Sequence, residues 1–284
     1  MSERLRTLTA GLGFAEAPRW HAGELWFVDY FAGNVQTIDL AGRRRVVAAV
    51  PGTPGGLGFL PDGTPLVVSQ REFALYAIDK QGRLTRYADL SRFARGAANE
   101  LLVDGGGRAY VGHHGFDFFG GAPQKPSSLL LVATDGSVRE VADGLVFPNG
   151  MALTPDGRML ILAESFAARL TAFDVASDGT LGLRREWAQI PGHTPDGICL
   201  DAEGAVWLGS PLSGAFLRVH EGGAVLDRLD VADGRWAVAC VLGGADRCVL
   251  CCVTAATTLE GMPQGKSEAF IELADVAVAG AGVP

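Results

Sequence analysis

The sequence lacks the features that mark membrane, secreted and nucleic-acid-binding proteins. No run of about 18 apolar residues occurs, so no membrane-spanning helix is expected. Residues 1–6 lead into no apolar segment of signal-peptide length, and secretion is therefore not predicted. Lys and Arg number 24 against 32 Asp and Glu, so no basic stripe is available to bind phosphates. We expect neither a membrane nor a nucleic acid as a partner.

Cysteine is also scarce. The chain has five cysteines, an odd number, and three of them lie in one strand-like stretch at 248–253. Buried reduced thiols suit this pattern better than a disulfide framework or a Cys-x-x-Cys metal site, which favours a cytoplasmic location. A Gly-x-Ser-x-Gly elbow in a strand–turn–helix context is missing too, which argues against a serine hydrolase of that type.

Long helical periodicity is absent, and a different repeat takes its place. Gly-bearing turns recur about every 40 to 50 residues, which is the spacing of propeller blades. Apolar stretches of strand length flank each turn. The six turns contain Gly23, Gly63, Gly105, Gly157, Gly204 and Gly243.

Six such units predict an all-β fold, namely a six-bladed β-propeller of four-stranded blades. Closed all-β folds of this length are commonly one unit, so residues 1–284 are expected to form a single propeller domain. The N-terminal strand Leu5–Thr9 is expected to close the ring by pairing with the last strand near Phe270–Leu273. Gly280–Pro284 is expected to be a loose tail.

One position near the start of each unit is rich in oxygen ligands. The first strand of every blade lines the central channel, so equivalent positions converge in space. These positions hold Glu16, Gly55, Asn99, Asn149, Asp196 and Val238. Two carboxylates and two amide oxygens form the donor set of a hard divalent cation, which makes Ca²⁺ the favoured metal. Mg²⁺, Mn²⁺, Zn²⁺ and Fe²⁺ stay open as alternatives.

Three motifs follow one another along the chain: EAPRW at 16–20, FPNGMALTPDG at 147–157 and PDGICLD at 195–201. In order and spacing they resemble the family that contains senescence marker protein 30, gluconolactonases and luciferin-regenerating enzyme, over essentially the whole chain. The resemblance implies a six-bladed propeller in which Glu16, Asn149 and Asp196 hold a divalent metal. Asn99 is expected to be a further ligand or to orient substrate or water.

The activity implied by the resemblance is hydrolysis of a lactone, a small molecule, by metal-assisted transfer of its acyl group to water. The cation would polarise the lactone carbonyl, and Asp196 is predicted to act as catalytic base as well as ligand. A direct nucleophilic role for Asp196 stays open. We expect a monomer or a weak homo-oligomer.

One departure from the family pattern concerns the substrate. Sugar-lactone members have an Arg-x-Asn-Asp pattern where this sequence has AANE at 97–100, so the arginine that would meet sugar hydroxyls is missing. The loop that follows at 113–121 is rich in Gly and Phe, and its phenylalanines are expected to line the pocket mouth or to pack beneath the loop. His113 and His114 are predicted substrate contacts, with an ordinary surface role as the alternative. The substrate is then a sugar lactone or a more apolar lactone.

Two other functions stay open. One is a promiscuous phosphotriester or ester hydrolase of the same fold. The other is a noncatalytic propeller that binds a ligand. Glu16, Asn149 and Asp196 count against the second, because a scaffold has no need of a charged ring in its channel.

Overall fold

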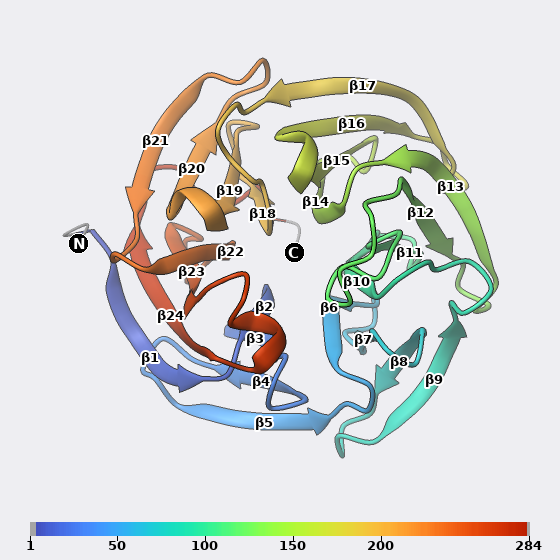
Figure 1. Ribbon diagram of the computed structural model, residues 1–284, viewed down its shortest axis with the longest axis horizontal. Coiled ribbons are helices and arrows are strands. Elements are labelled where there is room, and N and C mark those ends of the chain that lie inside the picture. The colour runs from blue at the N-terminus through green and yellow to red at the C-terminus, as the bar shows by residue number, and fades with distance from the viewer. Residues whose placement is uncertain (1–3, 283–284) are drawn as a thin grey trace.

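The fold is built from short strands and turns. The computed structural model describes residues 4–282, which contain 24 strands in six four-stranded antiparallel sheets. The sheets stand radially around a central channel, like the blades of a propeller (Figure 1). The predicted all-β, six-bladed β-propeller is confirmed. Within residues 4–282 the only helices are three short 3₁₀ turns, η1 (Ser165–Ala167), η2 (Pro211–Ser213) and η3 (Met262–Gln264), and none of them could span a membrane.

The blades are numbered here along the chain, and the strands of each are given from the channel outwards. Blade 1 has β2 (Ala15–His21), β3 (Glu24–Asp29), β4 (Asn34–Ile38) and β5 (Arg44–Ala49), and blade 2 has β6 (Pro54–Phe59), β7 (Pro65–Ser69), β8 (Ala74–Ile78) and β9 (Leu84–Asp89). Blade 3 has β10 (Ala98–Val103), β11 (Ala109–His113), β12 (Ser127–Val132) and β13 (Val138–Leu145), and blade 4 has β14 (Pro148–Leu153), β15 (Met159–Glu164), β16 (Arg169–Val175) and β17 (Leu181–Gln189). Blade 5 has β18 (Ile198–Leu200), β19 (Val206–Ser210), β20 (Ala215–Val219) and β21 (Val225–Asp230), and blade 6 has β22 (Arg235–Gly243), β23 (Val249–Thr257), β24 (Ser267–Asp275) and β1 (Arg6–Leu12).

The two ends of the chain close the ring in blade 6. β1 lies antiparallel to β24, with Arg6 opposite Leu273 and Thr7 opposite Glu272. The N-terminal strand is therefore the outermost strand of the last blade, as predicted. Because β1 leads directly into blade 1, this pairing holds the first and last blades together.

The predicted loose tail is wrong for the residues before 283. Gly280 pairs with Asp201 in an antiparallel bridge, and the Ala281 N–H donates to the Leu200 carbonyl at 3.0 Å. The segment is ordered by backbone pairing with blade 5, a long-range contact that local composition does not reveal. Residues 283–284 lie outside the described residues.

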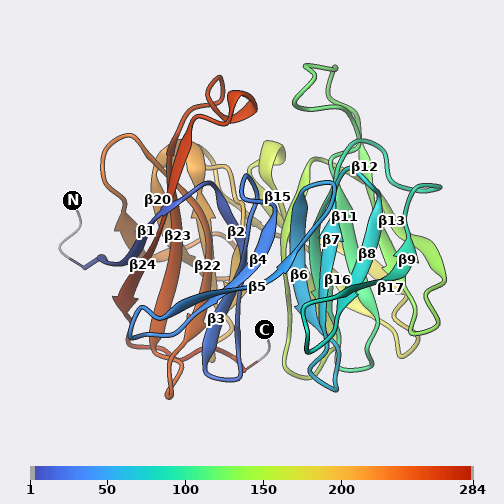
Figure 2. The same ribbon diagram turned by 90° about the horizontal axis from the view of Figure 1, so that it is seen from below.

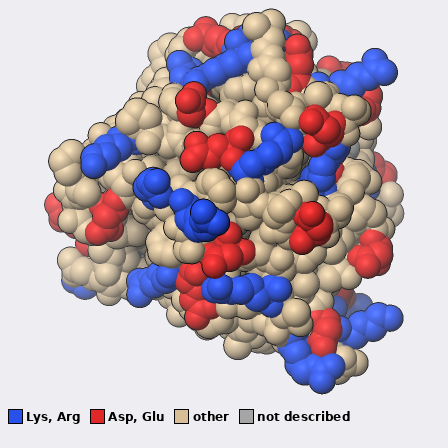
Figure 3. Space-filling model, turned by 90° about the vertical axis from the view of Figure 1, so that its right-hand side faces the viewer, with Lys and Arg blue, Asp and Glu red and all other residues tan. Residues whose placement is uncertain are grey.

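Hydrophobic cores lie between neighbouring blades. For example, Leu66 and Leu75 of blade 2 pack in one cluster with Leu101 and Val111 of blade 3. β6 and β10 are buried along their whole length. The outer wall of the ring is charged, and in Figure 3 acidic and basic side chains are interspersed on the face shown. All five cysteines are free.

The channel-lining strands share an irregularity where the predicted ligands lie. Regular pairing with the second strand is interrupted between Glu16 and Arg19 in blade 1, and at the equivalent place in blades 2, 3, 4 and 6. In blade 5 Asp196 precedes β18 altogether. An interruption of this kind breaks the alternation of faces and redirects a side chain. It lets these positions face the channel although the rest of each strand packs against its neighbours.

Glycines beside the predicted ligands permit the blades to meet at the channel. A Cβ on Gly150 would lie 2.4 Å from the Asp196 carbonyl oxygen, and one on Gly197 would lie 2.3 Å from the Ala239 Cβ. The backbones of blades 4, 5 and 6 are joined there, because Gly150 N–H donates to Asp196 O and Gly197 N–H donates to Val238 O. The Asn-Gly and Asp-Gly pairs of the sequence thus combine a predicted ligand with a close approach of two backbones.

We expect Gly150→Ala to lower the free energy of unfolding by roughly 1–3 kcal/mol, because the added methyl group must displace the backbone of Asp196. Urea denaturation measures the change. Gly105→Ala is the matched control, since Gly105 lies in an exposed turn with no atom within 4 Å of an added Cβ, and its effect should stay within about 0.5 kcal/mol. Equal unfolding midpoints for Gly150→Ala and the wild type would contradict the close approach.

Candidate active site

Four predicted oxygen ligands line one cavity at the channel mouth. Glu16 comes from β2, Asn99 from β10, Asn149 from β14 and Asp196 from the irregular segment before β18, so four different blades contribute. The same four side chains also line a smaller space deeper in the channel. The outer cavity opens to solvent at the channel mouth, and these four side chains form its inner part. The ring therefore brings together the residues that the repeat register selected.

Side-chain amides form a chain of hydrogen bonds around this cavity. Gln70 Nε2 donates to Asn99 Oδ1 at 3.3 Å, and Asn99 Nδ2 donates to Asn149 Oδ1 at 3.3 Å. Asn149 Nδ2 in turn donates to Ser165 Oγ at 3.4 Å, and the Ser165 hydroxyl donates to the Pro195 carbonyl at 2.7 Å. The chain spans blades 2 to 5 and fixes the orientation of the Asn99 and Asn149 amides.

The pKa values of the two carboxyl groups of the site, Glu16 and Asp196, are both raised. Burial, and secondly the charge of Glu100, raise the pKa of Glu16 to about 8. Burial also raises the pKa of Asp196 well above its ordinary value, with further increases from Glu16 and Glu100 and an opposing hydrogen bond from Asn149. One guanidinium is near, that of Arg19, and it pairs with Glu100 at 3.0 Å. Three carboxylates therefore face one positive charge.

This arrangement fits a divalent cation. A doubly positive ion between Glu16 and Asp196 would offset the excess negative charge, and the Asn149 and Asn99 amide oxygens would complete an oxygen donor set. Within residues 4–282 no cluster of three or more His, Cys, Asp or Glu side chains suited to a metal is found. The candidate set differs from such clusters because half of its donors are amides.

A second repeat register forms the cavity wall, and the sequence reasoning missed most of it. In blades 1 to 5 the residue that directly follows the second strand lines the cavity: Tyr30, Gln70, His114, Ser165 and Pro211. Only His114 was predicted as a substrate contact. The signal was present, since each of these residues stands at the same place in its repeat.

The residue just before each wall residue is buried and polar, and we call these five residues the latches. Each bonds to the backbone of the segment that leads into the innermost strand of its own blade. The contacts are Asp29 to Gly13 and Phe14, Ser69 to Pro51, His113 to Arg95, Glu164 to Val146, and Ser210 to Thr194. Because the predicted ligands follow these bonded residues by two to four positions, the latches fix where Glu16, Asn99, Asn149 and Asp196 stand.

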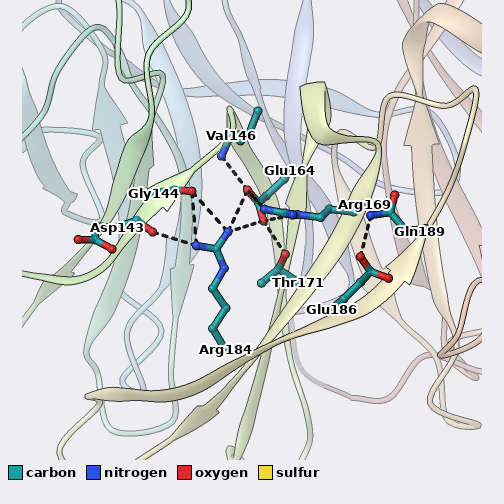
Figure 4. A network of polar contacts seen from close by, with 9 residues as sticks. All are labelled: Asp143, Gly144, Val146, Glu164, Arg169, Thr171, Arg184, Glu186 and Gln189. Carbon is teal, nitrogen blue, oxygen red and sulfur yellow. Dashed lines mark hydrogen bonds and ion pairs between the residues drawn. The ribbon is translucent and has the colours of Figure 1, made fainter.

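The strongest latch is Glu164, shown in Figure 4. Its fully buried carboxylate accepts hydrogen bonds from the Val146 N–H at 2.7 Å, from Thr171, and from the guanidinium groups of Arg169 and Arg184 at 2.8 and 3.1 Å. Burial alone would raise the pKa of Glu164, but the hydrogen bonds, that of Arg169 above all, more than offset it and the pKa is lowered. The carboxylate is thus held ionised.

The two loop histidines have different surroundings. His113 does not line the cavity. Its Nδ1 lies 3.0 Å from the Arg95 carbonyl oxygen and its Nε2 lies 2.9 Å from Ser128 Oγ. A substrate contact for His113 stays a prediction that this geometry does not favour. His114 lines the cavity, and its buried Nδ1 has no hydrogen-bond partner among residues 4–282. Burial, and secondly His113, lower the pKa of His114 to about 4, so its ring is neutral at pH 7.

The fold and the cavity together define a six-bladed propeller with an oxygen-rich pocket at its channel mouth. Residues 14–257 match the family model described as SMP-30/Gluconolactonase/LRE-like region, and the chain belongs to this family. It is 27% identical over 243 residues to a 6-deoxy-6-sulfogluconolactonase of Pseudomonas putida, covering 81% of this chain and 79% of the relative. It is equally 27% identical to Pentonolactonase XacC of Haloferax volcanii, covering 80% and 76%. The fold is shared with a calcium-binding protein, regucalcin, from Agrobacterium tumefaciens, with a TM-score of 0.77, 22% identity, and 98% and 97% of the two chains covered.

We expect Glu164→Gln to lower the free energy of unfolding by about 2–3 kcal/mol at neutral pH, since hydrogen bonds to a charged group contribute about 1.5–3 kcal/mol. The folded-state pKa of Glu164 is depressed, so its contribution is present above the unfolded pKa of about 4.3 and is lost as the pH falls through the folded value. The gap between wild type and variant should thus be constant above about pH 5 and shrink below it.

Urea denaturation between pH 3 and pH 8 measures this gap. Glu268→Gln is the control, because Glu268 is an exposed residue of β24 and should change stability by less than about 0.5 kcal/mol. A gap that is absent at pH 7, or that widens in acid, contradicts the role assigned to Glu164.

Proposed function

We propose that the protein is a divalent-metal-dependent hydrolase that opens a lactone ring. The observation that supports this best is the pair Glu16 and Asp196, two half-buried carboxylates from different blades that line one solvent-open cavity. The charge of Glu16 contributes to the raised pKa of Asp196. Membership of the family and the lactonase names of the two relatives point to the same reaction. Whether the lactone is a sugar lactone or a more apolar one does not follow from these names.

Glu16, Asn149 and Asp196 would hold the metal, with Asn99 as a fourth ligand or as a residue that orients substrate or water. Ca²⁺ is the metal that this all-oxygen donor set favours. When bound, the cation would polarise the lactone carbonyl and stabilise the negative charge that develops on its oxygen. The hydrogen-bonded chain from Gln70 to Ser165 holds both amides in place before substrate enters.

Asp196 is the proposed general base. Its carboxylate takes a proton from a water molecule while the water oxygen forms a bond to the lactone carbonyl carbon. The bond between that carbon and the ring oxygen then breaks, and the ring oxygen receives the proton back from Asp196. The sum is one lactone and one water giving one hydroxy acid. The ring of His114, which is neutral at pH 7 and lines the cavity, is proposed to donate a hydrogen bond to the substrate.

Removal of divalent metal should abolish lactone hydrolysis, and stoichiometric Ca²⁺ should restore it. Proton release from a lactone panel, read beside the metal content of the same sample, checks this. Full turnover by protein that contains no bound metal would end the proposal of metal dependence.

Asp196→Asn should lower kcat by about 100-fold or more, because it removes a general base. The variant should also lose the stabilisation by metal, which for the wild type is about 2.7 kcal/mol at a Ca²⁺ concentration 100 times the Kd. Asp233→Asn, in the exposed loop after β21, is the matched control and should keep both properties. Undiminished activity of Asp196→Asn would remove Asp196 from the mechanism.

A further inference from the structure

The cavity mouth is surrounded by apolar side chains. Phe118, Phe119, Phe147 and Phe166 lie on the side of blades 3 and 4, and we call them the aromatic shelf. Leu212 of η2 and Leu259, in the loop before η3, line the same cavity from blades 5 and 6. Figure 2 shows that the β11–β12 loop and the β23–β24 loop project from the same face of the ring. The mouth thus lies between two projecting loops with apolar side chains.

The aromatic shelf is an ordered stack. The Phe147 ring lies between His114 at 4.6 Å and Phe166 at 4.3 Å, both stacked, and the Phe118 ring meets it edge-on at 5.1 Å. Phe147 adopts φ 54°, a left-handed backbone conformation that is strained in a bulky residue. It stands two residues before Asn149, so the strained turn places the stack beside the proposed metal ligands.

Much of the shelf is open to solvent. Phe119 and Phe166 are 38% and 40% exposed, and Leu212 and Leu259 across the mouth are 57% and 54% exposed. When an apolar group covers apolar surface of this kind, water is displaced and the free energy of the system falls. The continuity of the shelf with the proposed active site indicates that this group is part of the substrate.

Four of the polar side chains of the cavity are engaged with one another. Gln70, Asn99, Asn149 and Ser165 form a chain of hydrogen bonds that ends on the Pro195 carbonyl. None of the cavity-lining residues that the structure describes is a Lys or an Arg. The several hydroxyls of a sugar lactone would each need a partner on entering this pocket, and an unpaired buried hydroxyl opposes binding.

We propose that the substrate is a lactone with an alkyl or aryl substituent, which binds on the aromatic shelf, and not a polyhydroxylated sugar lactone. This inference rests on the proposed lactone hydrolysis. The ring carbonyl would lie toward Glu16, Asn149 and Asp196, and the substituent would extend outward over Phe147 and Phe166. The loop that begins at His114 then determines specificity.

The test compares δ-valerolactone, δ-lactones with progressively longer alkyl chains, and D-glucono-δ-lactone, using Ca²⁺-loaded full-length protein and correcting for spontaneous hydrolysis. We expect kcat/KM to rise about 3- to 4-fold per added methylene, which is the value of one buried CH₂. D-Glucono-δ-lactone should be no better a substrate than δ-valerolactone. Phe166→Ala should flatten the dependence on chain length, whereas Leu183→Ala, at an exposed site on β17, should leave it unchanged.

Two other results have distinct meanings. If D-glucono-δ-lactone is hydrolysed faster than every alkyl lactone, or if Phe166→Ala keeps the full chain-length dependence, the apolar substrate class is overturned and lactone hydrolysis stands. If the Ca²⁺-loaded protein hydrolyses neither class of lactone, the proposed function itself fails, and this inference fails with it.

Discussion

Closure of the ring is the constraint on which the rest of the structure depends. Glu16 and Asp196 are 180 positions apart in the chain, and no local element could bring their carboxylates together. The pairing of β1 with β24 fixes blade 1 against blade 6, and the innermost strands then have one shared axis. Burial of the apolar surfaces between blades stabilises the ring, and this offsets the unfavourable repulsion between the two carboxylates.

Ring closure alone places strands, and the latches place side chains. Each latch ties the backbone of the segment that leads to the channel to the end of the second strand, so a ligand follows a fixed point by a few residues. Glu164 has the most contacts, and His113 performs the same task with a neutral ring bonded on both nitrogens. The chemistry proposed for the cavity thus depends on the polar contacts of the latches, because a displaced segment would move a proposed ligand with it.

The sequence was sufficient for the fold and for the convergence of Glu16, Asn99, Asn149 and Asp196 on one cavity, because regular turns set the phase of the repeat and these residues share one register. Their role as metal ligands stays a prediction. The sequence was insufficient to predict the residues that form the cavity wall. Tyr30 and Gln70 share a register too, but their residue types suggest no chemistry on their own. The sequence pattern does not separate His113 from His114, although neighbouring residues at the end of a strand face opposite ways. The pairing of Gly280 with Asp201 depends on a contact between distant segments and has no local signal.

The proposed site for a divalent cation lies where four blades meet, and a crystal structure of the Ca²⁺-loaded protein tests it. We expect one cation with oxygen ligands at about 2.3–2.6 Å from Glu16, Asn149 and Asp196, and open positions toward the aromatic shelf. A structure from crystals grown in saturating Ca²⁺ that has no ion at these three side chains, or has it elsewhere in the channel, would overturn the proposed metal site.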